Sequence, residues 1–198
     1  WGSHVSSGGS SGGAGSAVMA GIGALAHGND IGGSLRFPAA ANGAVTVKPG
    51  LGRIPAWNST QKNERGMLAQ SMSVQGLLTR SVGDLDLAMP AMVVSDAHDP
   101  FHVPLEYRLA SVDAPLRVAF CTETPGFDTH PDVAKALQNA AEALTDAGYQ
   151  VEEKNIPFLE ETGNCGFRAL MGEVSVMMGK DIREYGSETI QNIFTEYF

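Results

Sequence analysis

The spacing of apolar residues predicts a strand, a helix and a second strand in the second half of the chain. Residues 115–121 are apolar enough for a strand, and residues 149–153 alternate between apolar and polar as a second strand does. Between them, apolar residues recur at helical spacing, from a cap at Thr129 or His130 to a stop at Gly148. The apolar stripe comprises Val133, Leu137, Ala140 and Leu144. This order predicts a βαβ unit with parallel strands and a right-handed crossover.

Shorter elements are predicted in the first half, where glycine and proline interrupt the apolar pattern. In chain order they are a buried helix at 16–22, a strand at 25–27, a short helix from Pro38 to Asn42-Gly43 and a strand at 44–47. Residues 54–68 are irregular and polar apart from Trp57, a composition typical of a loop that shapes a pocket. With the βαβ unit, these elements predict an α/β fold, a mixed sheet flanked by helices.

A further helix is predicted behind Ser81. Ser81 and Asp84 match a capping box, and apolar residues follow at helical spacing from Val82 to Val93. Pro90 within this pattern should kink or shorten the helix. Residues 95–104 have the composition of a loop, and residues 160–198 carry a helical pattern.

The overall composition is that of an acidic globular domain. Of the 198 residues 43% are hydrophobic, enough for a sizeable core, and the formal net charge is −9. Because a nucleic-acid surface needs clustered Lys and Arg, this charge argues against nucleic acid as a partner. Only Cys121 and Cys165 occur, without a C-x-x-C pair, so neither a disulfide framework nor a zinc site is indicated.

The sequence carries no obvious membrane or export signal. No uninterrupted apolar run is long enough to span a bilayer, and the start at Trp1 lacks the charged and apolar regions of a secretory signal. Since the first residue is not Met, a targeting segment could still lie ahead of it. We expect no membrane segment and a cytoplasmic location.

Two glycine turns that each carry a serine stand out from this background. Ser10 lies in the sequence GGSSGG, and Ser34 lies in the sequence DIGGS. Because glycine has no Cβ, the backbone of such turns can approach a ligand closely and direct its N–H groups inward. In the second turn, the N–H groups from Ile31 to Ser34 could converge on an oxyanion that forms beside Ser34. GGSSGG alone is also typical of a flexible linker, so the chemical interpretation depends on both turns together.

The two turns and the residues after them resemble the amidase signature family. Its hallmark is a GGSSGG turn followed, at the spacing seen here, by D-[TI]-G-G-S-[IL]-R-x-P, which this chain matches from Asp30 to Pro38. The resemblance continues through Gly43, Lys48-Pro49, Gly52-Arg53-Ile54-Pro55, Gln75-Gly76 and Arg80-Ser81-Val82. The family domain is more than twice as long, with strands on either side of this segment. The resemblance therefore implies that residues 1–198 are a central, partial domain, with the signature core at 8–55 and the βαβ-like segment at 115–156.

The resemblance also implies which residues act. It assigns the nucleophile to Ser34 and a bridging serine, usually preceded by a cis peptide, to Ser10. It assigns the oxyanion hole to the backbone of Ile31, Gly32, Gly33 and Ser34. The third catalytic member of the family is a lysine upstream of the GGSSGG turn, and no lysine precedes Ser10 in this chain. We therefore expect that this base lies outside the chain and that the 198 residues alone are inactive.

The implied activity is amide hydrolysis through an acyl-serine intermediate, which gives a carboxylic acid and ammonia or an amine. No cofactor and no metal are expected. The expected partner is a small-molecule amide, and the full-length protein could form a homodimer. Two alternatives remain: the glutamine-hydrolysing subunit of an aminoacyl-tRNA amidotransferase, and a catalytically incomplete binding module. Residues 55–60 and 71–76 differ from the motifs usual in that subunit, which favours a free-standing amidase.

Two rival motifs overlap the glycine turns. Residues 21–26 fit a dinucleotide fingerprint, but the acidic residue that should contact the ribose is missing. The pattern G-x-S-x-G of a nucleophile elbow occurs around Ser10, with Asp128 and His130 as nominal partners. A capping role at a helix N-terminus explains that pair more simply.

Two further motifs lie in predicted loops. Ser59-x-x-Lys62 matches one element of a β-lactamase, but the companion motifs S-D-N and K-T-G are absent. His98 and His102 have the spacing of metal ligands on a helix, but Pro100 between them opposes such a helix. We expect both histidines to lie in a surface loop.

Overall fold

The computed structural model describes residues 4–62, 65–108 and 115–195. The chain divides into two compact units: the first unit, Trp1–Leu109, and the second unit, Ala110–Phe198. Both units combine helices with short strands, which confirms the predicted α/β class. Among the described residues, no helix combines the length and the apolar character needed to cross a membrane.

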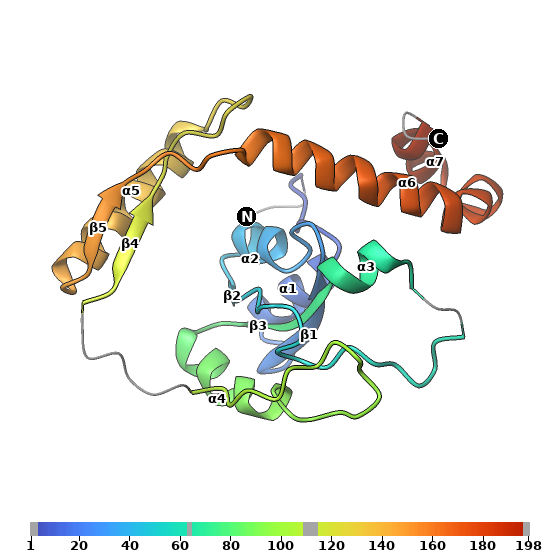
Figure 1. Cartoon of the computed structure of the whole chain (residues 1–198), viewed down its shortest axis with the longest axis horizontal. Helices are drawn as coiled ribbons and strands as arrows, with labels where there is room; N and C mark the ends of the chain where they lie inside the picture. Colours follow the sequence, from blue (N-terminus) through green and yellow to red (C-terminus); the bar gives the residue numbers. More distant parts are fainter. Residues whose placement is uncertain (1–3, 63–64, 109–114, 196–198) are drawn as a thin grey trace. The chain divides into compact units, whose positions relative to one another are not determined.

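The first unit is built on a three-stranded antiparallel sheet in the order β1-β3-β2 (Figure 1). β1 (Leu25–Asp30) pairs along its whole length with β3 (Val74–Thr79), so that Asp30 lies opposite Val74. β2 (Val45–Thr46) pairs with the other edge of β3. The strands predicted around β1 and β2 are therefore confirmed, whereas the apolar pattern does not predict β3.

β3 is buried on both faces of the sheet. Its residue Leu77 belongs to a cluster with Ile54, Leu85 and Met89. The next residue, Leu78, belongs to a second cluster with Leu35 and Ala39. Because successive side chains of a strand point to opposite faces, the two clusters cover the two sides of β3. All six residues of β3 are buried, which explains why the strand shows no alternation between apolar and polar positions.

The described residues of the first unit form four helices: α1 (Gly12–Met19), α2 (Arg36–Asn42), α3 (Met67–Met72) and α4 (Val82–Met92). α1 starts earlier than predicted, and α3 is not predicted by the pattern. α2 begins before Pro38 and ends, as predicted, ahead of Gly43, whose φ of 72° is left-handed. The predicted start of α4 is confirmed, because the Ser81 hydroxyl accepts a hydrogen bond from the Asp84 N–H at 3.1 Å. Pro90 lies in the last turn of α4.

The second unit contains the predicted βαβ arrangement. β4 (Arg117–Phe120) and β5 (Gln150–Glu153) pair in parallel, and α5 (Pro131–Asp146) lies between them in the chain. His130 caps α5 by accepting the Asp132 N–H at 3.2 Å, and Gly148 follows the helix with a φ of 92°.

Two helices follow the βαβ arrangement. α6 (Leu159–Tyr185) and α7 (Glu188–Thr195) match the helical pattern predicted for 160–198, of which residues 196–198 lie outside the described residues.

The strands of the two units form separate sheets. The sheet of the first unit is antiparallel and that of the second unit is parallel, so the described strands do not form the one mixed sheet that was predicted.

Candidate active site

The turn that carries Ser34 is organised by the carboxylate of Asp30. Asp30 is the last residue of β1 and is fully buried. Its Oδ1 accepts a hydrogen bond from the Gly33 N–H at 2.8 Å, and its Oδ2 accepts from the N–H groups of Leu35 and Arg36 at 3.1 and 3.3 Å. The carboxylate therefore holds the backbone on both sides of Ser34.

The Arg36 side chain completes the surroundings of this carboxylate. Its Nε and Nη2 donate to Oδ2 and Oδ1 of Asp30 at 3.0 and 2.9 Å, a two-point pairing. Burial by itself disfavours the charged form of Asp30. The hydrogen bonds from the Arg36 side chain and from the backbone outweigh this effect and hold the pKa of Asp30 well below its ordinary value. The hydrogen bond to Asp30 in turn raises the pKa of Arg36.

The four backbone N–H groups of this turn are not equivalent. The sequence interpretation directs the N–H groups of Ile31, Gly32, Gly33 and Ser34 at one anionic oxygen. The N–H of Gly33 is instead directed at the Asp30 carboxylate. Within the described part of the chain, the N–H groups of Ile31, Gly32 and Ser34 have no protein acceptor. These three groups remain able to bind an anionic oxygen.

The two glycine turns are in contact. The N–H of Ser11 donates a hydrogen bond to the backbone carbonyl of Ser34 at 3.1 Å. The peptide bond between Gly9 and Ser10 is cis, as the family resemblance implies. Ser10 is exposed and Ser34 is partly buried. The structure thus brings the two predicted serines into adjoining turns.

Asn42, the last residue of α2, ties the first turn to α2 and α1. Its side-chain amide donates to the carbonyl oxygens of Ser7 and Pro38 at 2.8 and 2.9 Å. Its Oδ1 accepts a hydrogen bond from the Ser16 hydroxyl of α1 at 3.2 Å. A Cβ at Gly8 would lie 2.9 Å from the Pro38 nitrogen, so the chain approaches α2 this closely only because residue 8 is glycine.

Leu35, the residue after Ser34, anchors the second turn on the sheet. Its side chain is fully buried against Gly28 of β1 and Gly76 of β3, which are paired across the two strands. A Cβ at Gly28 would lie 2.7 Å from one Leu35 methyl group, and a Cβ at Gly76 would lie 2.6 Å from the other. The two glycines therefore provide the space that Leu35 fills, and this packing fixes the position of Ser34.

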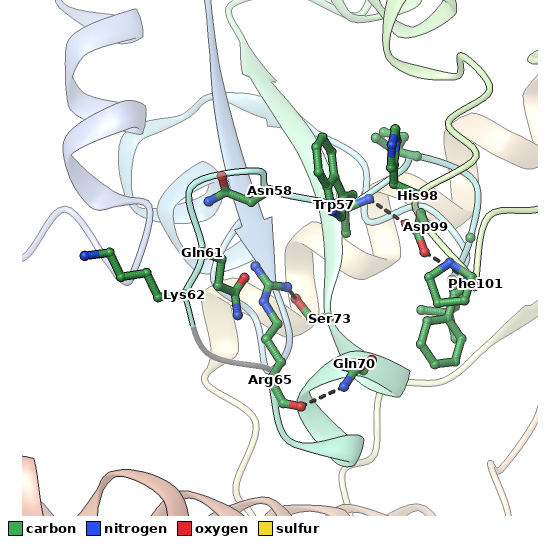
Figure 2. A pocket seen from close by; sticks show the side chains of 15 residues that line it. Trp57, Asn58, Gln61, Lys62, Arg65, Gln70, Ser73, His98, Asp99 and Phe101 are labelled. Carbon is green, nitrogen blue, oxygen red and sulfur yellow. Dashed lines mark hydrogen bonds between the residues drawn. The ribbon is translucent and has the colours of Figure 1, made fainter.

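A pocket of about 450 Å³ opens in the first unit (Figure 2). It is lined by residues of the predicted pocket-shaping loop, by residues 98–101 and by residues near the start of β3, including Ser73. Ser10 and Ser34 do not line it. Because Asp30 pairs with Val74 in the antiparallel ladder, Ser73 occupies the register position next to Ile31. One lining residue of the pocket, Ser73, thus lies next to the end of the strand pair that leads into the candidate oxyanion turn.

The side chain of Asn29 links Ser73 of the pocket to β1, the strand that leads into the turn of Ser34. Its Nδ2 donates to the Ser73 hydroxyl at 2.7 Å, and that hydroxyl lies 3.0 Å from the Asn29 Oδ1. Neither Asn29 nor the role of Asp30 is predicted from the sequence. A signal for Asp30 does exist, since an Asp directly before a glycine turn readily accepts hydrogen bonds from N–H groups further along. No comparable local signal links Asn29 to Ser73.

Histidines of two rival motifs have structural explanations. His130 caps α5. The ring of His98 stacks on Trp57, with ring centres 4.3 Å apart, and its Nδ1 lies 2.8 Å from the Asp96 carboxylate. In the part of the chain that the structure describes, no group of three or more His, Cys, Asp or Glu side chains is arranged to hold a metal ion.

The chain belongs to the amidase signature family: the family model, Amidase, matches residues 1–198. The chain is similar to an indoleacetamide hydrolase of Bradyrhizobium japonicum, with 44% identity over 188 residues that cover 95% of this chain and 40% of the relative. It is also similar to one subunit of the glutamyl-tRNA(Gln) amidotransferase of Staphylococcus aureus strain Mu3, with 36% identity over 155 residues that cover 76% of this chain and 31% of that relative.

A solved structure supports the same assignment. The structure of a bacterial aryl acylamidase of the amidase signature family matches with a TM-score of 0.71 and 25% identity, covering 95% of this chain and 41% of that chain. The predicted family is therefore confirmed. The chain spans about two fifths of the length of the first curated relatives that it matches.

Proposed function

We propose that the complete protein hydrolyses a carboxamide to a carboxylic acid and ammonia or an amine, with Ser34 as the nucleophile. The observation that carries this proposal is the turn around Ser34. Asp30 holds the backbone on both sides of Ser34, and the turn with Ser10 is hydrogen-bonded to it. Membership in the amidase family supports the same reaction.

The first half of the proposed reaction forms an ester on Ser34. The Ser34 Oγ bonds to the carbonyl carbon while its proton passes to Ser10, and Ser10 passes its own proton to a basic group, the lysine that the family resemblance implies. The carbonyl oxygen becomes an oxyanion, which the N–H groups of Ile31, Gly32 and Ser34 would stabilise. The C–N bond then breaks as the leaving nitrogen takes up the proton.

The second half releases the acid. Water attacks the ester carbonyl, loses a proton to the same relay, and the Ser34 hydroxyl is restored as the carboxylic acid leaves. Gly33 takes part in this scheme by shaping the turn, because its N–H is already bonded to Asp30. Asp30 and Arg36 act as positioning residues, since they touch the turn and not the reacting atoms.

Primary amides are the first substrates to test, because the relative with 44% identity is named for indoleacetamide. The similarity to part of a glutamyl-tRNA(Gln) amidotransferase supports glutamine hydrolysis as a second candidate. A protein that hydrolyses neither class would correspond to the third alternative, a binding module. The homodimer and the cytoplasmic location stay predictions.

Separate replacement of Ser10 and Ser11 in the complete protein tests the proposed relay. Ser10→Ala should slow acylation by about 10²- to 10⁴-fold, the usual effect of losing a proton-transfer partner. Ser11→Ala should have little effect, because within the described ranges the Ser11 hydroxyl makes a single long hydrogen bond, to the Asn29 carbonyl at 3.5 Å. Single-turnover release of ammonia from phenylacetamide and from glutamine measures both variants. A larger loss of acylation rate in Ser11→Ala than in Ser10→Ala would show that Ser10 is not the proton shuttle.

A further inference from the structure

The pocket of the first unit is closed by two segments that are far apart in the sequence. The Val103 N–H donates to the Gly52 carbonyl at 2.8 Å, and the Arg53 guanidinium donates to the Glu106 carbonyl at 2.8 Å. Gly52 has a φ of +79°, and a Cβ there would overlap the carbonyl of Phe101. The two segments therefore run in close backbone contact along one side of the pocket.

Asp99 joins these segments at the pocket itself. Its Oδ2 accepts the Ala56 N–H at 2.7 Å, and its Oδ1 accepts the Phe101 N–H at 2.8 Å. Ala56 directly precedes Trp57, and Asp99 directly follows His98. The Asp99 carboxylate thus holds the backbone next to both rings of the Trp57–His98 stack (Figure 2).

The stack presents an aromatic surface to the pocket. The two rings are 4.3 Å apart and within 19° of parallel, and both residues line the cavity. Trp57 remains 50% exposed, so much of its indole surface is available to a ligand. A third flat ring could extend such a stack, because aromatic rings attract one another in offset face-to-face arrangements. The cavity volume of about 450 Å³ lies in the range of small-molecule sites.

The pocket also has polar groups, and one of them is linked to the strand that leads into the turn of Ser34. The Gln70 amide donates to the Arg65 carbonyl at 2.7 Å, and the Arg65 guanidinium lies 3.4 Å from the Ser73 hydroxyl. Ser73 is the lining residue that is hydrogen-bonded to Asn29, which directly precedes Asp30. A substrate whose carbonyl group lies at the turn of Ser34 could therefore extend its acyl group past Ser73 toward Trp57.

We propose that this pocket binds the acyl group of the substrate, that the group carries a flat aromatic ring, and that Trp57 determines this specificity. The inference rests on the proposed amide hydrolysis and adds the substrate class to it. Asp99 acts as a positioning residue, because its contacts are with the backbone beside the stack. Trp57 acts through contact with the ring.

Substrate selectivity of the complete protein tests this proposal. The substrates are 1-naphthylacetamide, hexanamide and acetamide, and the variants are Trp57→Ala, Trp57→Phe and, as a control in the second unit, Phe127→Ala, whose side chain is exposed. Trp57→Ala should lower kcat/KM for 1-naphthylacetamide relative to acetamide by about tenfold or more, as expected when a pocket loses an apolar wall. Trp57→Phe should restore most of the ratio, and Phe127→Ala should leave it unchanged.

Three results would overturn the proposal. One is an unchanged ratio in Trp57→Ala, the second is an equal loss for hexanamide and 1-naphthylacetamide, and the third is an equal loss in Phe127→Ala. If Ser34→Ala still abolishes hydrolysis in those cases, the proposed function stands and only the pocket assignment fails.

A binding measurement separates the two proposals completely. Calorimetric titration of 1-naphthylacetamide into the Ser34→Ala protein should give a Kd that rises about tenfold on adding Trp57→Ala. An unchanged Kd would overturn the pocket assignment even if the unsubstituted protein hydrolyses no amide, a result that would refute the proposed function alone.

Discussion

The two units of the chain use their apolar residues in opposite ways. Among the described residues, nine of the ten buried hydrophobic side chains lie in the first unit, and only Ala141 lies in the second. In the second unit, large apolar side chains such as Leu137, Phe158 and Val176 are exposed. The candidate active site thus lies on the unit whose interior is closely packed. Such an interior resists displacement of the backbone. A preorganised turn requires this resistance, because its N–H groups must stay in place.

The polar residues show the same contrast. The buried polar side chains that the structure describes, Asp30, Ser73, Gln75 and Thr79, all lie in the first unit. Asp30 supports the turn of Ser34, and Ser73 lines the pocket. In the second unit, the ion pairs that Glu152 forms with Arg117 and Lys154 are largely exposed. Exposed pairs stabilise a fold only weakly, whereas a buried carboxylate depends strongly on its partners.

The largest difference in stability loss between the two units should come from replacing one aspartate in each unit. Asp30→Asn removes the charge that Arg36 and three backbone N–H groups hold, and should lower the free energy of unfolding by about 3–5 kcal/mol. Asp132→Asn, at a carboxylate that is 90% exposed, should change it by less than about 0.5 kcal/mol. Urea denaturation of the complete protein measures both. Equal effects would show that the Asp30 network is unimportant to the fold.

The same variant predicts a pH dependence. Because the folded-state pKa of Asp30 lies below its ordinary value of about 3.9, the ionised group stabilises the fold fully above that value. This stabilisation is lost as the pH falls below about 4 toward the folded-state pKa. The difference in stability between the unsubstituted protein and Asp30→Asn should therefore be constant near neutral pH and narrow in acid. A difference that widens below pH 4 would contradict the sign of the shift.

Shortening one apolar side chain in each unit should give a smaller difference in stability loss between the units. Leu78→Ala empties space in the cluster with Leu35 and Ala39, and should cost about 2–5 kcal/mol. Leu137→Ala on α5, where the side chain is 37% exposed, should cost less than about 1.5 kcal/mol. Thermal unfolding followed by circular dichroism compares the two. A larger effect at Leu137 would mean that the second unit has a core of its own.

The smallest predicted difference concerns helix caps. Ser81→Ala removes the hydroxyl that accepts the Asp84 N–H, and should cost about 1 kcal/mol. His130→Ala removes a weaker acceptor at 3.2 Å, and should cost about 0.5 kcal/mol. Urea denaturation of both variants tests the order, and Ser81→Thr serves as a control that keeps the hydroxyl. The reverse order would place the stronger cap in the second unit.

The parts of the fold that were predictable have local causes. The caps at Ser81 and His130 and the stop at Gly148 involve neighbours within a few residues, so the sequence around them is sufficient. β3 was not predictable in this way, because its burial on both faces removes the alternating pattern that marks a strand. Its burial depends on α4, which follows it, and on the Leu35–Ala39 region, which lies about 40 residues earlier in the chain.

The candidate site also has parts that were predictable from the local sequence and parts that were not. The two serine turns and the loop around Trp57 were recognisable from residue type and spacing. The pairing of Asp30 with Arg36 lies within one turn. The contact between Ser11 and Ser34 and the stacking of Trp57 on His98, in contrast, join segments that are far apart in the sequence. No local rule specifies such contacts, because they arise only when the sheet brings the segments together.

The most direct test of the account is covalent labelling of Ser34 in the complete protein. A fluorophosphonate reacts with an activated serine, and peptide mass spectrometry identifies the residue that carries the adduct. The account predicts one adduct, on the peptide that contains Ser34. That adduct should be lost in Ser34→Ala, retained in Ser11→Ala and formed more slowly in Ser10→Ala. Stoichiometric labelling of the Ser34→Ala protein, or of another serine with Ser34 unmodified, would contradict the assignment of Ser34 as the nucleophile.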